Sequence, residues 1–227
     1  MKILWRIILS KIKIYKNLFN HDDLNHIRNY YTKVYNNSKE NLCSIFKSGV
    51  EKLDFYPGFY FLIHRNLKND YLKSGINENL KNRGSEENTL VIQGQSIQYT
   101  KVKFLRPNNQ GIQFAYVIEL GNDPNTQPQI LNVINTIKEN NFDMSFDSIA
   151  CTMQESGHMI HTHKDGGVHG RYHIVLNQDA EDYFYIENKG FKLNFGDMFY
   201  VETSTCNHTF MHFSNKLRIH LIFDEPQ

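Results

Sequence analysis

The sequence contains little cysteine, with three residues among 227, at positions 43, 151 and 206. The number is odd, and no two of them have CxxC spacing. Neither a disulfide framework nor a thiolate zinc site is therefore indicated. A reducing, cytoplasmic location is the simpler expectation.

Net charge is also nearly absent. The 25 Lys and Arg residues against 24 Asp and Glu residues leave +1 at pH 7. This balance provides no global attraction to nucleic acid or to an anionic membrane. We therefore expect a small-molecule or peptide partner and no nucleic acid.

A long apolar run is missing as well. Near the N-terminus, Arg6, Lys11 and Lys13 interrupt the apolar stretch before the ~20 residues that a membrane span needs, and no cleavage site of small residues follows. We expect no transmembrane segment. Residues 1–19 are instead expected to form an amphipathic helix that packs on the domain, with contact to a membrane surface as the alternative.

Short strand-like segments separated by turn residues dominate the second half of the chain. Alternation and β-branched residues predict strands at TLVIQ, IQYTKVKFLR, GIQFAYVIEL, SIACTMQ, HMIHTH, RYHIVLN, DYFYIEN, FKLNF, DMFYVE, HTFMHF and LRIHLIFD. A helical pattern covers residues 126–140, and residues 1–80 are expected to be helical and irregular.

We therefore expect a mainly β fold with flanking helices, in the α+β class. The specific expectation is a double-stranded β-helix, the cupin-like jelly roll. Its catalytic core would cover residues 81–227, with residues 1–80 as a helical N-terminal region packed on it in one compact unit.

The most informative pattern is formed by His163, Asp165 and His208. Two imidazoles and one carboxylate are the ligands of mononuclear non-haem Fe(II) oxygenases. Side chains at i and i+2 on a strand point to the same face, so His163 and Asp165 can hold one ion. Arg218, ten residues after His208, carries a planar fork suited to a carboxylate near the metal.

Other uses of these histidines stay open. His161 and His163 can start a four-ligand cupin site, although the following KDGGVHGRYH offers no Glu. His161, His163 and His208 can also form a three-His zinc site for hydrolysis. That site leaves Asp165 and Arg218 without roles. The last option is a protein that binds no metal.

The C-terminal half resembles the aspartyl/asparaginyl β-hydroxylase family of Fe(II)/2-oxoglutarate dioxygenases, which includes free-proline cis-hydroxylases. The resemblance covers about residues 146–225. It rests on SGHMIHTHKD at 156–165, RYH at 171–173, GDMFYVETSTCNH at 196–208 and HTFMHFSNKLRIHLIFD at 208–224.

The resemblance implies that His163 and His208 are the metal imidazoles and that Asp165 is the metal carboxylate. In animal aspartyl hydroxylases the position of Asp165 is Gly, whereas the proline-hydroxylase branch has a carboxylate there. Halogenating relatives lack this carboxylate. Hydroxylation or desaturation is therefore the reaction that the resemblance implies.

Four further residues receive implied roles near the co-substrate. Arg218 is similar to the Arg that pairs with the distal carboxylate of 2-oxoglutarate, and Thr152 matches a hydroxyl residue that assists it. Arg171 and His173 match an R-x-H pair that lines the co-substrate and substrate site.

The implied cofactors are Fe(II), 2-oxoglutarate and O2. The expected function is hydroxylation of an amino acid, free or within a peptide or natural-product precursor, with release of succinate and CO2. The alternatives are a cupin-type metal-binding protein without oxygenase activity, as an isomerase or small-acid sensor, and an interaction module that has lost function.

Overall fold

The computed structural model describes residues 5–9, 11–38, 46–47, 59–65, 86–92, 95–105, 112–119, 127–144, 148–157, 159–165, 168–179 and 182–225. For residues 5–9 and for the segments between 46 and 119, the description covers the path and pairing of the backbone.

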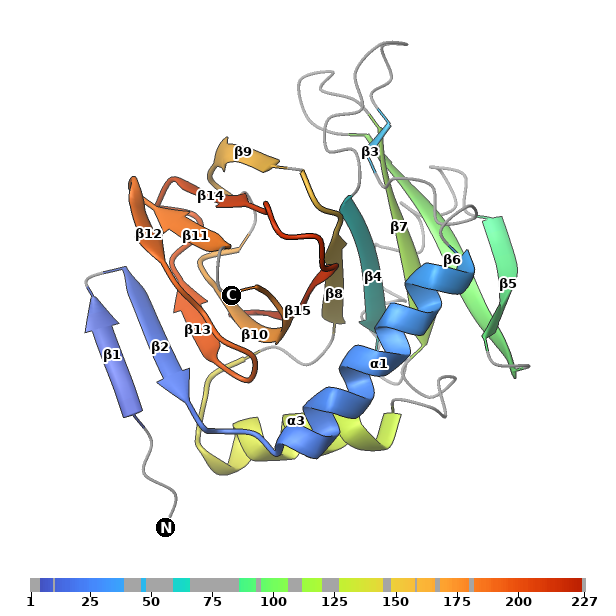
Figure 1. The fold of residues 1–227 in the computed structure, drawn as a ribbon. Coiled ribbons are helices and arrows are strands. Elements are labelled where there is room, and N and C mark those ends of the chain that lie inside the picture. The colour runs from blue at the N-terminus through green and yellow to red at the C-terminus, as the bar shows by residue number, and fades with distance from the viewer. Residues whose placement is uncertain are drawn as a thin grey trace.

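Two β-sheets form most of the described chain (Figure 1). In the large sheet, ten strands are paired in the order β1 (Trp5–Leu9), β2 (Ile12–Lys16), β13 (Met198–Val201), β10 (Arg171–Asn177), β15 (Arg218–Asp224), β8 (Ser148–Gln154), β4 (Phe59–Arg65), β7 (Ile112–Glu119), β6 (Gln95–Leu105) and β5 (Glu86–Ile92). β3 (Phe46–Lys47) also pairs with β7. The small sheet has the order β12 (Lys189–Phe191), β11 (Tyr183–Ile186), β14 (His208–Met211) and β9 (Met159–His163).

The strand pairs described are antiparallel, apart from the parallel pair β4 and β7. Antiparallel strands can be joined by short turns, which agrees with the frequent turn residues in the second half of the sequence.

An apolar core joins the small sheet to one face of the large sheet. Val175 and Phe199 of the large sheet belong to the same buried cluster as Phe184 and Phe210 of the small sheet. The rings of Phe184 and Phe199 lie 5.1 Å apart between centroids. Burial of each such side chain contributes about 1.5 to 3 kcal/mol. This core therefore fixes the separation of the two sheets.

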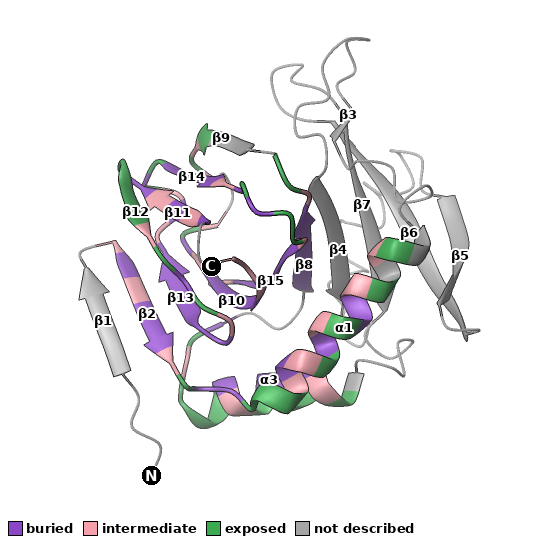
Figure 2. Cartoon of the chain, viewed as in Figure 1, coloured by how far each residue is buried: buried purple, intermediate pink, exposed green. Residues whose placement is uncertain are grey.

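Two helices cover the opposite face of the large sheet, α1 (His21–Ser38) and α3 (Gln127–Glu139) (Figure 1). Their inward faces repeat at helical spacing and are buried (Figure 2), as at Leu24 and Ile27 of α1 and Ile130 and Ile137 of α3. These side chains share a core cluster with Leu221 of β15.

The start of α1 has recognisable N-terminal signals. The Asn20 side chain accepts a hydrogen bond from the backbone N–H of Asp22, at 2.9 Å, and Asp22 and Asp23 place negative charge in the first turn. Both features stabilise the positive end of a helix.

Most of the expected elements are confirmed. The mainly β fold, the helix within residues 126–140 and ten of the eleven strands predicted from alternation are present. The strand expected at FKLNF is wrong, because β12 ends at Phe191 and precedes most of that segment. The double-stranded β-helix topology and the domain boundary at residue 80 stay predictions.

The amphipathic helix expected over residues 1–19 is wrong. Residues 5–9 and 12–16 form a β-hairpin, and Ile12 and Ile14 of β2 pair with Val201 and Phe199 of β13. The segment IKIYK alternates apolar and basic residues with a period of two, and the free edge of β13 supplies the hydrogen-bond partners. Pairing with β13 therefore stabilises residues 12–16 as a strand and not as a helix.

Among the described residues of the range 1–80, the expected helical structure is present in α1, and the other described elements are strands. β2 and β4 are strands of the large sheet, hydrogen-bonded to β13 and β8. The alternative of membrane contact through residues 1–19 stays a prediction, and the side chains of residues 1–10 lie outside the described residues. Among the helices of the described chain, none has the length and apolar character to cross a membrane.

Candidate metal centre

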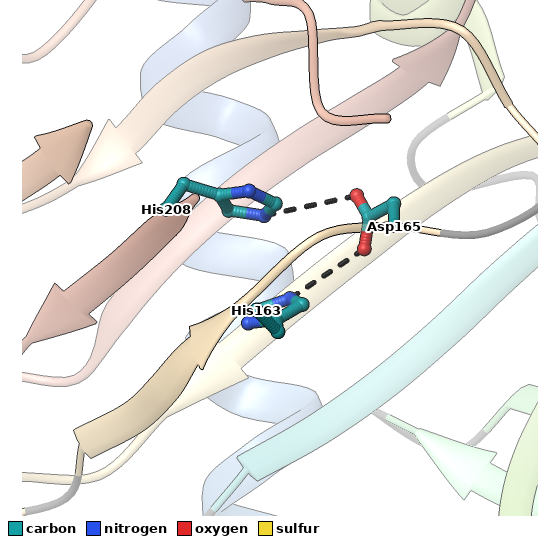
Figure 3. Close-up of side chains that lie close together, drawn as sticks. All are labelled: His163, Asp165 and His208. Atoms are coloured by element: carbon teal, nitrogen blue, oxygen red, sulfur yellow. Dashed lines mark ion pairs between the residues drawn. The ribbon is translucent and has the colours of Figure 1, made fainter. Parts of the chain in front are cut away.

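The structure brings His163, Asp165 and His208 together (Figure 3). His163 ends β9 and His208 begins β14, and the two residues lie opposite each other with ring centroids 4.3 Å apart. Asp165 lies two residues beyond the end of β9, not on the strand as expected. Its Oδ1 is 3.5 Å from His163 Nε2, and its Oδ2 is 3.8 Å from His208 Nε2.

One potential ligand atom from each of these three residues lies within 4.8 Å of the others. Metal bonds to nitrogen and oxygen of about 2.0 to 2.2 Å place neighbouring ligand atoms on the order of 3 to 4 Å apart. The three side chains can therefore close on one ion by small movements. Two imidazoles with one carboxylate suit Fe(II) and leave further positions for other ligands.

His208 is oriented for metal binding by its surroundings. It is buried, its Nδ1–H donates a hydrogen bond to the Cys206 carbonyl at 3.3 Å, and its ring stacks on Phe184 with centroids 5.9 Å apart. A hydrogen bond from Nδ1 fixes the tautomer and leaves Nε2 as the metal-binding atom. Burial also lowers the pKa of His208, which favours the neutral form that binds metal.

Asp165 is held in its ionised form. Burial alone raises its pKa, but hydrogen bonding to His163 and the positive charge of Arg171 outweigh burial and hold the pKa well below its usual range. The backbone N–H of Asp165 donates to the Thr203 carbonyl at 2.9 Å. A carboxylate is therefore available beside the two imidazoles at neutral pH.

Arg171 lies beside the candidate metal ligands. Its Nη1 is 2.8 Å from Asp165 Oδ2, and its Nε is 2.9 Å from Asp224 Oδ1. The guanidinium thus donates to two carboxylates, one of which is the candidate metal ligand Asp165. The role implied for Arg171 at the co-substrate stays a prediction.

Thr152, His173 and Arg218 lie on the face of the large sheet that is directed toward the small sheet. They come from β8, β10 and β15, and all three are buried. Thr152 Oγ1, His173 Nδ1 and Arg218 Nε have no hydrogen-bond partner among the residues that the structure describes. Buried polar atoms are rarely left unpaired, so these atoms indicate a polar ligand.

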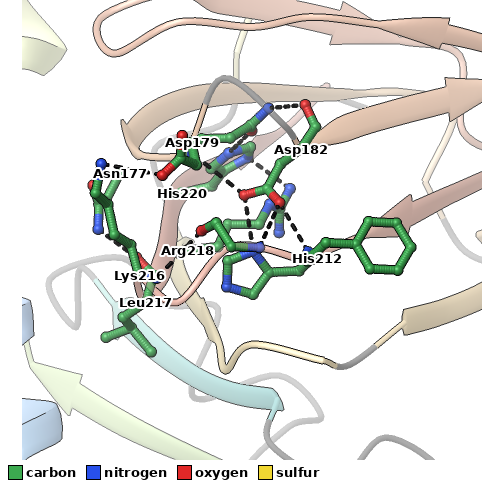
Figure 4. Close-up of polar contacts among 11 residues, drawn as sticks. Asn177, Asp179, Asp182, His212, Lys216, Leu217, Arg218 and His220 are labelled. Carbon is green, nitrogen blue, oxygen red and sulfur yellow. Dashed lines mark hydrogen bonds and ion pairs between the residues drawn. The ribbon is translucent and has the colours of Figure 1, made fainter.

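Arg218 is positioned by several contacts (Figure 4). Its Nη2 donates to His220 Nδ1 at 2.9 Å, and His220 Nε2 donates to Gln178 Oε1 at 2.9 Å. The Arg218 guanidinium lies over the Phe210 ring, 3.6 Å from its centroid. Phe210 and His208 share one face of β14, because side chains at i and i+2 point the same way. Arg218, which belongs to β15, therefore contacts β14 at Phe210, two residues from the candidate metal ligand His208.

The charge of Arg218 is incompletely balanced. Burial lowers its pKa to about 9, and attraction to Asp182 offsets only part of this effect. Arg218 stays a cation at neutral pH, and burial of a cation is costly unless an anion accompanies it. An anionic ligand at this position would balance the buried charge.

Asp182 and His212 form a buried hydrogen-bonded pair close to Arg218. Asp182 Oδ2 lies 2.8 Å from His212 Nδ1, while Oδ1 accepts hydrogen bonds from the backbone N–H groups of Phe213 and Ser214 at 3.0 and 3.3 Å. Asp182 therefore anchors the turn that leads from β14 into β15. This role was not found from the sequence, because Asp182 and His212 are 30 residues apart.

His173 packs as a neutral imidazole. Its ring stacks on Phe199, with centroids 4.7 Å apart and planes 10° apart. Burial, followed by the charge of Arg218, lowers its pKa well below the ordinary value. A neutral ring with an unpartnered Nδ1 can donate to or accept from a ligand.

The metal sites that involve His161 are not tested, because the His161 side chain lies outside the described residues. Among the residues that the structure describes, one group of His, Cys, Asp or Glu side chains could hold a metal ion. It consists of His163, Asp165 and His208.

The fold and site define a mainly β protein with a candidate metal centre of two histidines and one carboxylate, and with a buried arginine beside it. The chain belongs to the aspartyl/asparaginyl beta-hydroxylase family, which it matches over residues 89–226, more than half of its length. This confirms the family expected from the sequence, and membership supports an oxygenase.

Comparison with solved structures finds β-rich proteins of low sequence identity. An oxidoreductase of the 2OG-Fe(II) oxygenase family from Burkholderia pseudomallei is 13% identical, with 74% of this chain and 84% of that chain covered and a TM-score of 0.36. A predicted oxalate decarboxylase from Thermotoga maritima is 11% identical, with 65% and 96% covered and a TM-score of 0.31.

A variant of salicylate 1,2-dioxygenase from Pseudoaminobacter salicylatoxidans, in complex with gentisate, is 15% identical, with 34% of this chain covered and a TM-score of 0.29. The match spans 20% of the length of that dioxygenase. A search of curated proteins finds no match.

Proposed function

We propose that the protein is an Fe(II)/2-oxoglutarate-dependent dioxygenase with a double-stranded β-helix core. It hydroxylates an amino acid, free or within a peptide or natural-product precursor, and releases succinate and CO2. The observation that carries the proposal is the pairing of the triad His163, Asp165 and His208 with the buried, incompletely balanced cation of Arg218.

One group of residues would bind the metal, and a second group would bind the co-substrate. His163 Nε2, His208 Nε2 and an Asp165 oxygen would hold Fe(II), because these atoms are gathered and the carboxylate is ionised. Bound Fe(II) and 2-oxoglutarate supply the O2-dependent oxidation of an unactivated C–H bond, with loss of CO2 from the co-substrate.

Arg218 and Thr152 suit the distal carboxylate of 2-oxoglutarate. The guanidinium of Arg218 offers an unpartnered Nε–H, and Thr152 offers an unpartnered hydroxyl on the neighbouring strand. Thr152 lies opposite His220, two positions from the partner of Arg218, so both donors serve the same region. A carboxylate there would satisfy buried atoms that otherwise stay unpaired.

His173 suits the side of the co-substrate nearer the metal. It faces the space between the sheets, and its neutral ring offers Nδ1 to a ligand oxygen. The stacking on Phe199 fixes the ring plane. His173 would thus orient the co-substrate without adding charge.

A direct test is succinate formation by the anaerobically prepared Fe(II) protein after O2 is added with 2-oxoglutarate and a panel of amino acids and peptides. We expect turnover with at least one substrate, and its loss in His163→Ala and His208→Ala. His26→Ala serves as the matched control, since His26 is exposed on α1, away from the metal centre. Full turnover by His163→Ala contradicts the proposal.

The alternative is a cupin-type metal-binding protein without oxygenase activity. Titration of the anaerobic Fe(II) protein with 2-oxoglutarate separates the two functions. A chelated co-substrate produces a weak visible charge-transfer band. Metal binding without this band, in a correctly folded protein, favours the isomerase or sensor.

A further inference from the structure

Arg171 connects the metal carboxylate to a second carboxylate, that of Asp224. Arg171 Nη1 donates to Asp165 Oδ2 at 2.8 Å, and Arg171 Nε donates to Asp224 Oδ1 at 2.9 Å. Hydrogen bonds between ions are stronger and more directional than neutral ones. We call Asp165, Arg171 and Asp224 the ion-pair chain.

The β-sheet register builds this chain of contacts. Arg171 begins β10, Asp224 ends β15, and the two residues lie directly opposite each other in the antiparallel pair. Asp165 follows β9, which belongs to the small sheet. The ion-pair chain therefore ties a metal ligand to two paired strands of the large sheet.

Asp165 has a particular need for such support. It lies beyond the end of β9, and its backbone is tied there by one hydrogen bond to the Thr203 carbonyl. The bond from Arg171 fixes Oδ2, while Oδ1 stays directed toward His163. A carboxylate held at one oxygen presents the other to a metal in a defined direction.

Asp224 acts on the same carboxylate through Arg171. It fixes the Nε side of the guanidinium and balances part of its charge, so Nη1 remains aimed at Asp165. Arg171 and Asp224 are only partly buried, with side-chain exposures of 27% and 35%. Solvent weakens such pairs, so their main effect is orientation rather than stability of the fold.

We propose that Arg171 and Asp224 are positioning residues that orient Asp165 for metal binding, and that Arg171 serves the metal carboxylate instead of the co-substrate. The proposal rests on the proposed function, since it assumes a metal at His163, Asp165 and His208. It assigns Asp224 a role and changes the one implied for Arg171.

The test measures metal and co-substrate affinity separately. Co(II) serves as the probe, and its visible absorption reports both the dissociation constant and the ligand geometry. The dissociation constant of 2-oxoglutarate is then measured at saturating Co(II). Circular dichroism and thermal unfolding show that each variant is folded.

Asp224→Ala and Arg171→Lys are expected to weaken Co(II) binding by roughly 10- to 100-fold, the usual effect of losing a partner of a metal ligand. Their 2-oxoglutarate affinity at saturating Co(II) is expected to stay close to that of the wild type. Asp224→Asn keeps an acceptor oxygen and removes the charge, so its effect is expected to be smaller than that of Asp224→Ala.

Glu225→Gln provides the matched control. It removes one negative charge from the next residue, whose side chain accepts a hydrogen bond from Tyr200 at 2.7 Å. Co(II) affinity is expected to be unchanged. An equal loss in Glu225→Gln and Asp224→Asn overturns the proposal, because it would reflect general charge and not the ion-pair chain.

Two other results also overturn it. One is a folded Asp224→Ala protein with the Co(II) affinity of the wild type. The other is an Arg171→Lys protein that loses 2-oxoglutarate affinity but keeps Co(II) affinity. If the wild-type protein binds no Co(II) or Fe(II), the proposed function itself fails, so the two failures are distinguishable.

Discussion

Two buried imidazoles, His173 and His220, are expected to make the stability of the metal-free protein depend on pH. Burial, followed by the charge of Arg218, lowers the pKa of both rings well below the ordinary value. The neutral state of His220 is also fixed by its hydrogen bonds. Its Nδ1 accepts from Arg218, and its Nε2 donates to Gln178. A second proton on His220 would place an Nδ1–H group against the N–H of Arg218, where the ring now accepts a hydrogen bond.

The magnitude follows from the difference between folded and unfolded proteins. Because each folded pKa lies below the unfolded value of about 6.5, the unfolded chain takes up protons first as the pH falls. The free energy of unfolding is therefore unaffected by these two rings above about pH 6.5 and decreases as the pH falls below that value. At pH 5.5 each ring lowers the free energy of unfolding by about 1.4 kcal/mol, and the two rings together lower it by about 3 kcal/mol. His208, whose pKa burial also lowers, acts in the same direction.

The titration of Asp165 does not contribute to the change in stability between pH 7.5 and 5.5. Its pKa is lowered on folding, so its contribution is present above the unfolded value of about 3.9 and is lost only at lower pH. A loss of about 3 kcal/mol in a chain of this size corresponds to a fall in Tm of about 6 to 12 °C.

Urea unfolding in EDTA at pH 7.5, 6.5 and 5.5, followed by circular dichroism, measures the effect. The expected result is a fall of about 3 kcal/mol in the free energy of unfolding between pH 7.5 and 5.5. His220→Gln is expected to remove about 1.4 kcal/mol of that fall, since one titrating ring is absent. A wild-type change below about 1 kcal/mol would refute the reasoning.

Two further predictions concern the residues around the proposed co-substrate site. Arg218→Lys keeps the charge but loses the fork, so 2-oxoglutarate binding to the Fe(II) protein is expected to weaken by about 1.5 to 3 kcal/mol, or roughly 10- to 150-fold. Absorbance titration measures this effect, and unchanged affinity contradicts it. Asp182→Asn is expected to lower the free energy of unfolding by about 3 to 5 kcal/mol, because it leaves the buried Arg218 cation without its counter-ion and disturbs the buried hydrogen bond to His212. Urea unfolding at pH 7.5 checks this, and a loss below about 1 kcal/mol shows that Asp182 is not their essential partner.

The strands of the second half and the candidate metal ligands could be predicted from the sequence because their signals are local. Alternation marks β10 and β15 within seven residues each, and the spacing of His163 and Asp165 is two residues. The order of motifs then indicated His208 as the distant ligand. These inferences need no knowledge of which strand pairs with which.

The features that escaped prediction depend on pairing between distant segments. The segment IKIYK becomes a strand because β13 offers an edge to it. Asp224 meets Arg171 because of the register between β10 and β15. A shift of one residue would turn the Asp224 side chain to the other face of the sheet. Local sequence does not fix that register.

The candidate site depends on both sheets at once. The candidate metal ligands His163 and His208 belong to the small sheet, whereas Arg218 and the ion-pair partner Arg171 belong to the large sheet. A ligand that bridges a metal at this site and Arg218 would thus require a constant separation between the sheets. The aromatic core around Phe184 supplies this constancy, since its side chains fill the space between them. Packing within this core is therefore part of the binding geometry, although its residues carry no chemistry of their own.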